Sequence, residues 1–314
     1  MKKVLVLGGT GFVGRHVCEQ LTRAGIRVTV PTRRAINAQH VQMLPMVDVL
    51  EANVHDEATL QRLLPGHDAV VNLVAALHGS RKNFDKLHVE LPQKLARAMQ
   101  ATGVQRLVHI SAIGADVNGP SNYLQSKGAG EAALQGAGLQ LTILRPSVIF
   151  GAEDKFMNLF ARLQRCLPVV PLAGADVKFQ PVWVGDVAKT VLRCLQDPEH
   201  TMGQTYELGG SQVFTLRELV QMAGKLSEHP RPVIGMPLAL GWLQAGLMEI
   251  MPGEPLMSTD NVCSLMRDNV ANGQLPGLEA FDITPAALEP TAAQYLDLQG
   301  RADPLLQARL RAGR

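Results

Sequence analysis

The chain has 314 residues, of which 46% are hydrophobic and 18% are charged. Thirty basic and 28 acidic side chains leave a net charge of +2, which excludes the strongly basic surface typical of nucleic-acid-binding proteins. The four cysteines are too far apart for a CxxC or metal-ligand motif, so we expect buried thiols and no metal site. The amino-terminal residues read as a strand and a glycine turn rather than a signal peptide, and we expect a cytoplasmic protein.

Short apolar runs alternate with helical patterns over the first 150 residues. Strands are expected over 4–8, 27–31, 47–52, 68–76, 106–112 and 139–146. Helices are expected over 12–24, 56–64, 84–102 and 122–137. Strands and helices that alternate at this spacing predict right-handed crossovers and a doubly wound parallel sheet, the Rossmann type of α/β fold.

The regular alternation ends after residue 150, where prolines become more frequent. Further strands are expected over 179–184 and 204–210, and further helices over 185–196, 215–226 and 238–250. We therefore expect a cofactor-binding Rossmann domain over 1–150 and a smaller α/β substrate lobe over 151–314. Residues 179–196 are expected to pack back on the first domain.

The segment 233–251 is nineteen residues long and has a single charged residue, Glu249. Its length alone would admit a membrane span. Pro237 and three glycines interrupt it, and Gln244 and Glu249 would be costly at the middle of a bilayer. We expect a buried or pocket-lining helix, with an amphipathic surface that touches a membrane as the main alternative.

A glycine-rich turn, GGTGFVG, follows the first expected strand and opens the first expected helix. Gly8 permits the tight turn, Gly11 lets the backbone approach a pyrophosphate, and Gly14 lets the helix pack closely on the strand. The free N–H groups of the helix then face the phosphate charge. Because the pattern lies between a strand and a helix at the start of the chain, it predicts a dinucleotide site.

The end of the second strand favours NADP(H) over NAD(H). An NAD-binding protein usually has an acidic residue here, which binds the adenosine ribose. This chain has Thr32, Arg33 and Arg34 instead. Guanidinium groups suit a 2′-phosphate, because they form charge-assisted and often bidentate hydrogen bonds. The alternative is a pair of solvated surface arginines.

Tyr123 and Lys127 are four residues apart on an expected helix, so both side chains project from one face. A nearby ammonium should lower the pKa of the phenol and make Tyr123 a general acid or base. Lys127 could also hold the nicotinamide ribose. Ser111 ends the fifth strand, at the sheet edge where ligands bind, and its hydroxyl could bind a substrate oxygen. Alternatively, Ser111 is a turn residue that terminates the strand.

These residues resemble the short-chain dehydrogenase/reductase superfamily, in its extended or atypical branch. The GxxGxxG spacing is typical of that branch, and Ser111, Tyr123 and Lys127 match its catalytic triad. Only twelve positions separate Ser111 from Tyr123, and His88 or its neighbours stand where the extended enzymes usually have an asparagine. The cofactor site expected here comprises Gly8, Thr10, Gly11, Phe12, Val13, Gly14, Thr32, Arg33, Arg34, Asn53, Val54, Leu73, Val74, Ala75, Lys127 and Pro146.

Four linked segments resemble a narrower family, the atypical members related to the nucleotide-binding accessory subunit of mitochondrial complex I. These segments are 88–115, 123–131, 144–158 and 179–189, and the resemblance covers roughly residues 1–225. It implies tight NADPH binding, and the complex I subunit is regarded as structural. It also implies a peripheral contact with the inner membrane or a respiratory complex as an alternative to a wholly cytoplasmic protein.

Three functions follow as hypotheses. The first is an NADP(H)-dependent oxidoreductase that acts on an apolar carbonyl or quinone-like compound, with Tyr123 as proton donor. The second is a non-catalytic NADPH-binding protein of an assembly linked to complex I or ubiquinone metabolism. The third is a sugar-nucleotide epimerase or dehydratase, which the sparsely polar second lobe disfavours because such a substrate needs many hydrogen-bonding groups. A resemblance in fold does not identify a substrate.

Overall fold

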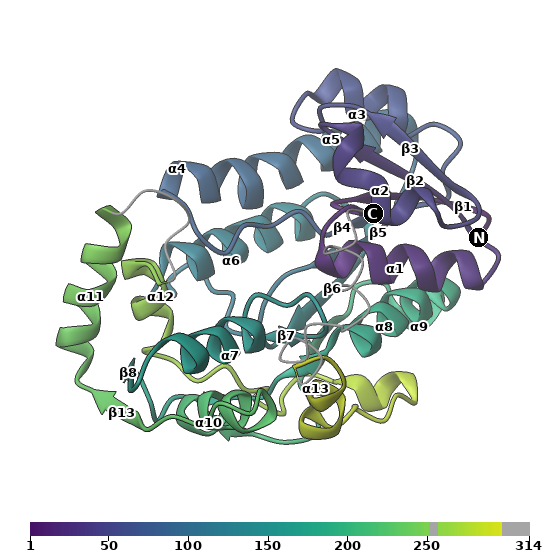
Figure 1. Ribbon diagram of the computed structural model, residues 1–314. Helices are drawn as coiled ribbons and strands as arrows, with labels where there is room; N and C mark the ends of the chain where they lie inside the picture. Colours follow the sequence, from purple (N-terminus) through teal and green to yellow (C-terminus); the bar gives the residue numbers. More distant parts are fainter. Residues whose placement is uncertain (251–256, 297–314) are drawn as a thin grey trace.

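Seven parallel strands form a central sheet in the order β11-β6-β5-β4-β1-β2-β3 (Figure 1). The structure is a computed structural model that describes residues 1–250 and 257–296. The strands are β1 (Lys3–Leu7), β2 (Arg27–Thr32), β3 (Val47–Glu51), β4 (Ala69–Asn72), β5 (Arg106–Ile110), β6 (Gln140–Pro146) and β11 (Thr205–Leu208). The expected doubly wound α/β fold is confirmed.

Helices cover both faces of this sheet, which explains why its central strands are continuous apolar runs. One core, which includes Val4, Val28 and Val71, lies between the sheet and the helices α1 and α8. The other, which includes Leu5, Leu60 and Leu95, lies under α3 and α5. The helices around the sheet are α1 (Phe12–Arg23), η1 (Ala35–Ala38), α2 (Gln39–Gln42), α3 (Glu57–Leu63), α6 (Asn122–Gln135), α8 (Val184–Gln196) and α9 (Pro198–Thr201).

The helix expected over 84–102 starts earlier and is irregular. It consists of α4 (Arg81–Phe84), the π-helical segment η2 (Asp85–Glu90) and α5 (Leu91–Thr102). Pro92 has no amide hydrogen to donate to the carbonyl of His88, so the regular α-helical pattern breaks one turn before it. Wide turns of this kind often occur at functional sites.

A second lobe packs around its own apolar core, which includes Phe150, Phe160 and Leu219. Its helices are α7 (Met157–Cys166), α10 (Leu216–Leu226), α11 (Leu238–Ile250), α12 (Thr259–Ser264), η3 (Leu278–Phe281) and α13 (Leu288–Leu296). Its short strands pair as β7 (Ile149–Phe150) with β10 (Val182–Trp183), β9 (Lys178–Phe179) with β12 (Phe214–Thr215), and β8 (Val170–Ala173) with β13 (Val233–Met236). The single strand expected over 179–184 is therefore two strands, because Pro181 cannot donate to a ladder.

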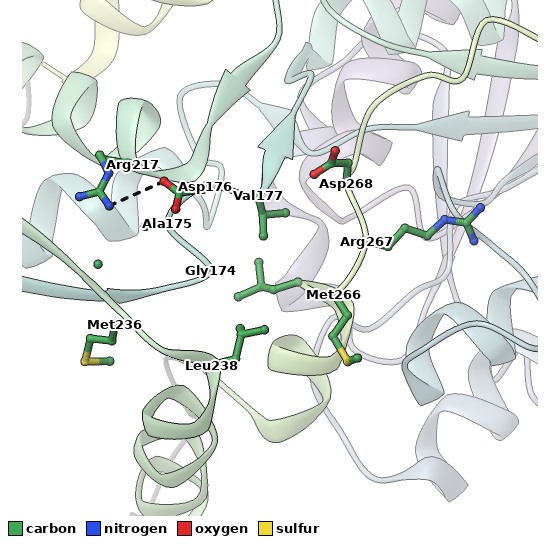
Figure 2. Close-up of a pocket in the computed structure, with 12 residues that line it drawn as sticks. Gly174, Ala175, Asp176, Val177, Arg217, Met236, Leu238, Met266, Arg267 and Asp268 are labelled. Atoms are coloured by element: carbon green, nitrogen blue, oxygen red, sulfur yellow. Dashed lines mark ion pairs between the residues drawn. The ribbon is translucent and has the colours of Figure 1, made fainter.

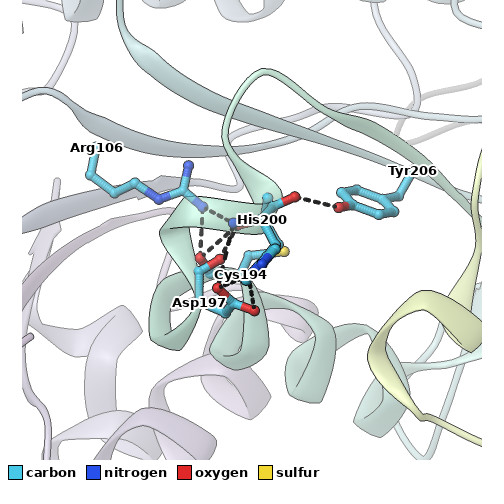
Figure 3. Close-up of polar contacts among 6 residues, drawn as sticks. Arg106, Cys194, Asp197, His200 and Tyr206 are labelled. Carbon is cyan, nitrogen blue, oxygen red and sulfur yellow. Dashed lines mark hydrogen bonds and ion pairs between the residues drawn. The ribbon is translucent and has the colours of Figure 1, made fainter.

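Arg106, at the start of β5, ties α8 and α9 to the sheet (Figure 3). Its Nη2 donates to the carbonyl of Cys194 at 2.7 Å and to Oγ1 of Thr201 at 3.0 Å. One acceptor is a main-chain carbonyl and the other is a neutral hydroxyl. These hydrogen bonds connect the sheet to the two helices, so we assign the buried cluster a structural role. The cysteine expectation is correct for Cys194 and Cys18, whereas Cys166 is exposed.

A buried or pocket-lining helix was expected over 233–251; helix α11 is not buried, whereas Gly235, Met236 and Leu238 at the start of the segment do line a cavity. The α11 residues Leu240, Trp242, Leu243, Leu247 and Ile250 are exposed, and Ile250 is 82% exposed. The small residues Gly241 and Ala245 face the protein instead. The beginning of the segment is strand β13, and residue 251 lies outside the described residues. Within the described residues, no helix is long and apolar enough to cross a membrane.

Candidate functional site

The residues expected to bind the cofactor lie at one edge of the sheet, because they follow the carboxyl ends of parallel strands. The glycine turn follows β1, Thr32 ends β2, and residues 53–54 and 73–75 follow β3 and β4. Pro146 ends β6. The strand order reverses between β1 and β4, which is the position where open α/β sheets bind ligands.

The glycine turn has no room for side chains. Gly8 has a φ of +81°, which favours glycine, and a Cβ there would lie 3.1 Å from the backbone of Leu73. A Cβ on Gly14 would collide with the carbonyl oxygen of Gly8. Gly11 is exposed and precedes the first turn of α1, so the free amides of that helix are accessible to a phosphate. This cradle fits a dinucleotide pyrophosphate.

Arg33 and Arg34 are exposed in the loop after β2. Thr32 is buried, and its hydroxyl donates to the carbonyl of Arg34 at 3.1 Å, which fixes the path of the loop. On the next loop, the side chain of Asn53 accepts a hydrogen bond from the amide of His55 at 3.1 Å. The two guanidinium groups thus lie beside the expected adenosine site.

Ser111, Tyr123 and Lys127 come from two elements that pack together. Ser111 follows β5, and Tyr123 and Lys127 lie one turn apart on α6. Nζ of Lys127 donates to the carbonyl of Ile110 at 2.9 Å, so the lysine lies directly beside the end of β5. The hydroxyl of Ser111 is buried and has no hydrogen-bond partner among the described residues.

The expected effect of Lys127 on Tyr123 is wrong for this structure. Burial raises the pKa of the Tyr123 phenol to about 12, and no nearby ammonium offsets it. Burial also lowers the pKa of Lys127 to about 8, against a smaller opposing effect of Glu131. The ammonium lies on the Ile110 carbonyl rather than against the phenol. The phenol of Tyr123 is therefore protonated at neutral pH.

His88, which the sequence places only where the extended enzymes have an asparagine, lies directly beside Tyr123. Its ring lies perpendicular to that of Tyr123, with centroids 5.6 Å apart. Nε2 accepts a hydrogen bond from the amide of Ala76, and Nδ1 donates to the hydroxyl of Ser126 at 2.8 Å, so the ring is neutral. Burial, and then Lys127, lower the pKa of His88 to about 3.

Glycines let α6 approach its neighbours closely. A Cβ on Gly130 would collide with the carbonyl oxygen of His88, and one on Gly128 would lie 2.6 Å from the backbone of Asp116. Further along the helix, the buried Glu131 accepts hydrogen bonds from Arg145 on β6 at 2.5 and 3.0 Å. These contacts fix the middle and the far half of the helix to the Rossmann sheet.

The amino end of α6 is bound by the second lobe instead. Oδ1 of Asp260 accepts from the amide of Asn122 at 2.7 Å, and Oδ2 accepts from the amide of Tyr123 at 3.1 Å. Asp260 lies 137 positions after Tyr123, and no local sequence pattern links the two residues. Sequence reasoning therefore missed this contact.

A cavity of about 510 Å³ lies in the second lobe beside the start of α11 (Figure 2). Met236, Leu238 and Met266 line one part of it, and Asp176, Arg217 and Asp268 bring charged groups to it. Asp176 and Arg217 form an ion pair at 3.7 Å on one side, and Figure 2 shows the side chain of Arg267 directed away from the cavity. The lining is therefore mixed and does not by itself select an apolar ligand.

Comparison with known proteins places the chain in a family. The NAD(P)H-binding family matches residues 8–198. The mitochondrial NADH dehydrogenase [ubiquinone] 1 alpha subcomplex subunit 9 of Mus musculus is 32% identical, over 93% of this chain and 78% of its own. Its counterpart in Arabidopsis thaliana is 30% identical over 93% and 76%. Ceramide reductase of Caulobacter vibrioides is 30% identical over 62% of this chain and 61% of its own.

Solved structures of enzymes share the fold. The dTDP-glucose 4,6-dehydratase of Streptomyces venezuelae, with NAD bound, has a TM-score of 0.74 and 21% identity over 93% of this chain and 95% of its own. The UDP-glucose 4-epimerase of Thermus thermophilus, in complex with NAD, has a TM-score of 0.70 and 21% identity over 96% and 99%. The chain belongs to the NAD(P)H-binding family and is related to subunit 9 of mitochondrial complex I.

Proposed function

We propose that the chain is an NADP(H)-dependent oxidoreductase that reduces an apolar carbonyl or quinone-like compound. The observation that carries this proposal is the unpaired hydroxyl of Ser111, buried at the end of β5 beside the helix with Tyr123 and Lys127. A buried polar group left without a partner costs about 1–3 kcal/mol. The oxygen of a substrate carbonyl would supply the partner that the described residues do not.

The side chains have separate roles in this proposal. The cofactor, when bound, supplies the hydride that reduces the carbonyl carbon. Tyr123 donates its phenolic proton to the carbonyl oxygen, and its raised pKa keeps that proton in place at neutral pH. Ser111 donates a hydrogen bond to the same oxygen. Lys127, one helical turn from Tyr123, holds the nicotinamide ribose.

The preference for the phosphorylated cofactor rests on the loop after β2. Arg33 and Arg34 are exposed there and stand where an acidic residue would select NAD. A 2′-phosphate would gain charge-assisted hydrogen bonds from these guanidinium groups. Gly8, Gly11 and Gly14 would hold the pyrophosphate.

An apolar substrate is supported by one relative. The Caulobacter relative is named a ceramide reductase, which acts on a lipid. The solved epimerase and dehydratase structures are 21% identical and support only the shared fold.

A contact with the bilayer surface is supported by α11. Its outward side carries leucines, Trp242 and Ile250, and its only charged residue, Glu249, accepts hydrogen bonds from the amide and hydroxyl of Thr259. A protein interface of ordinary composition would pair with hydrogen-bonding groups, which this side lacks apart from the Trp242 indole. Thirteen residues span about 20 Å, so the helix would lie in the membrane surface rather than cross it.

The relatives in complex I favour a second candidate, a non-catalytic NADPH-binding protein of a respiratory assembly. Turnover separates the two candidates. The experiment measures NADPH oxidation by the purified protein across quinones, enones and long-chain ketones. On a true substrate, Tyr123→Phe should lower turnover by about 10²–10⁴-fold. Its NADPH affinity should stay nearly unchanged, because the phenol contributes little to cofactor binding.

Tyr206→Phe is the matched control for this experiment. The Tyr206 hydroxyl lies 3.5 Å from the carbonyl of His200 in the structural cluster of Figure 3, so its loss should leave turnover intact. Full turnover of Tyr123→Phe would rule out the proposed mechanism. Absence of reduction across the whole panel would favour the non-catalytic candidate.

A further inference from the structure

Asp260 satisfies the free amides at the start of the helix that carries Tyr123. The first N–H groups of a helix have no partner within it. In α6, the carboxylate of Asp260 accepts from the amides of Asn122 and Tyr123, at 2.7 and 3.1 Å. The next amide, that of Leu124, donates to the hydroxyl of Ser121 at 3.2 Å.

The Ser121 hydroxyl is itself held from the second lobe. Oγ of Ser264 lies 2.8 Å from Oγ of Ser121, and both Asp260 and Ser264 belong to α12. Asp260 is only 8% exposed, so its carboxylate is shielded from water and its hydrogen bonds are strong. Helix α12 thus supplies or supports the whole cap of α6.

The Rossmann domain contacts α6 through side chains at its first turn and through closer backbone contacts further along: the Tyr123 ring lies against the rings of Phe84 and His88, with centroids 5.9 and 5.6 Å apart. Gly128 and Gly130 pack on the Rossmann domain, and Glu131 pairs with Arg145. Tyr123 lies in the first turn, before these anchors. The phenol is therefore placed by two sets of contacts, because the cap holds the backbone of Tyr123 and the Rossmann domain packs against its ring.

We propose that Asp260 is a positioning residue for the nicotinamide end of the site, which holds the first turn of α6 so that Tyr123 and Lys127 reach the cofactor. The inference rests on the proposed function, because it takes the roles of those two residues from it. Asp260 acts through the backbone of α6 and touches neither substrate nor cofactor. The second lobe thereby completes the reactive half of the site, whereas the Rossmann domain alone builds the adenosine half.

The test compares two ligands that share the adenosine half. NADPH carries the nicotinamide ribose, and adenosine 2′,5′-bisphosphate lacks it. Asp260→Asn keeps the shape of the side chain but places an amino group against one of the two amides. It should weaken NADPH binding by about tenfold or more, the worth of one charge-assisted hydrogen bond, and change bisphosphate binding by less than about twofold. Asp260→Ala should have a larger effect of the same kind.

Glu218→Gln is the matched control for this comparison. Glu218 is also a carboxylate of the second lobe that accepts a helix N-terminal amide, that of Thr215 at 2.7 Å, but it caps α10. This variant should bind both ligands like the unmodified protein. If a substrate has been found, Asp260→Asn should also lower kcat by about tenfold or more, because a displaced acid is poorly aligned, with little change in KM for the substrate.

Each outcome decides a different question. Equal losses for both ligands in Asp260→Asn would mean a general structural role, and no loss for either would mean that the cap is dispensable. Both results overturn the inference while leaving the proposed function in place. If the unmodified protein binds NADPH no tighter than the bisphosphate, the proposed hold of Lys127 on the nicotinamide ribose is wrong. In that case the proposed function fails first, and the inference fails with it.

Discussion

Lys127 donates a 2.9 Å hydrogen bond to the carbonyl of Ile110, so a buried ammonium lies against the end of the strand that leads to Ser111. Burial lowers the pKa of Lys127 to about 8, whereas an exposed lysine titrates near 10.5. The folded state therefore binds fewer protons than the unfolded state between these values. The cost of the buried charge is fully present below pH 8 and disappears as the pH rises toward 10.5.

This linkage predicts the pH dependence of stability. Lys127→Met removes the buried charge. The resulting change in the free energy of unfolding should be more favourable at pH 7 than at pH 10 by about 2–3 kcal/mol. Urea unfolding of both proteins at each pH measures the difference. Lys189→Met is the control, because that lysine is 45% exposed and pairs with Asp186. An effect of Lys127→Met that is independent of pH would contradict the burial of its charge.

The lowered pKa of His88 predicts that the protein loses stability at acid pH. The His88 pKa of about 3 is below the value near 6.5 of an exposed histidine, so stability is lost as the pH falls below 6.5. We expect this group to cost about 2 kcal/mol at pH 5. His88→Asn should flatten the acid limb of an unfolding curve, and His200→Asn should not, because Asp197 raises the pKa of the exposed His200. An acid limb unchanged by His88→Asn would mean that other groups cause the acid loss.

The arginines after β2 predict cofactor choice. Losing charge-assisted hydrogen bonds to a 2′-phosphate costs about 1.5–3 kcal/mol. Arg33→Ala should therefore weaken NADPH binding by a factor on the order of tens and leave NADH binding nearly unchanged. Calorimetric titration with both cofactors measures this. Arg23→Ala is a suitable control, since Arg23 is an exposed arginine paired with Glu19 on α1. Equal losses for NADPH and NADH would remove the proposed preference.

The sequence predicted the Rossmann part well because local patterns determine it. Each sheet strand was expected within a few residues of its observed bounds, since buried parallel strands are continuous apolar runs. Gly8 and Gly14 were expected for steric reasons that the structure bears out in its backbone contacts. The parallel topology then brings the strand ends to one edge, which is why residues that lie far apart in the sequence meet in one candidate site.

The remaining features depend on contacts between distant segments. The contact of Asp260 with α6 and the partners of His88 follow from how the helices pack, which no spacing encodes. The raised pKa of Tyr123 could not be predicted either, since it comes from the burial of the phenol by distant parts of the chain. Helix α11 was misjudged because an apolar run indicates burial only where the protein provides a surface to cover it.

The distribution of apolar residues on α11 is the opposite of that on an ordinary surface helix. Such helices turn their large apolar residues to the core, whereas α11 turns Gly241 and Ala245 inward and its leucines outward. A Cβ on Gly241 would lie 2.5 Å from Cβ of Ala173, so the helix lies close against β8. This packing fixes which side faces outward. Burying that side in the headgroup region would remove apolar surface from water, at about 0.8 kcal/mol per CH₂ group.

We therefore expect the protein to bind lipid vesicles, including neutral phosphatidylcholine ones, because the outward side of α11 has no basic residue. Leu243→Ser with Leu247→Ser should lower partitioning by about 30-fold, the equivalent of about 2 kcal/mol. Cosedimentation with vesicles measures it. The control pair, Met43→Ser with Leu50→Ser, removes apolar side chains that are 88% and 43% exposed elsewhere and should bind like the unmodified protein. Binding only to anionic vesicles, or equal losses in both pairs, would show that α11 does not make the contact. Recovery of the unmodified protein only with detergent would contradict an in-plane helix and favour insertion across the bilayer.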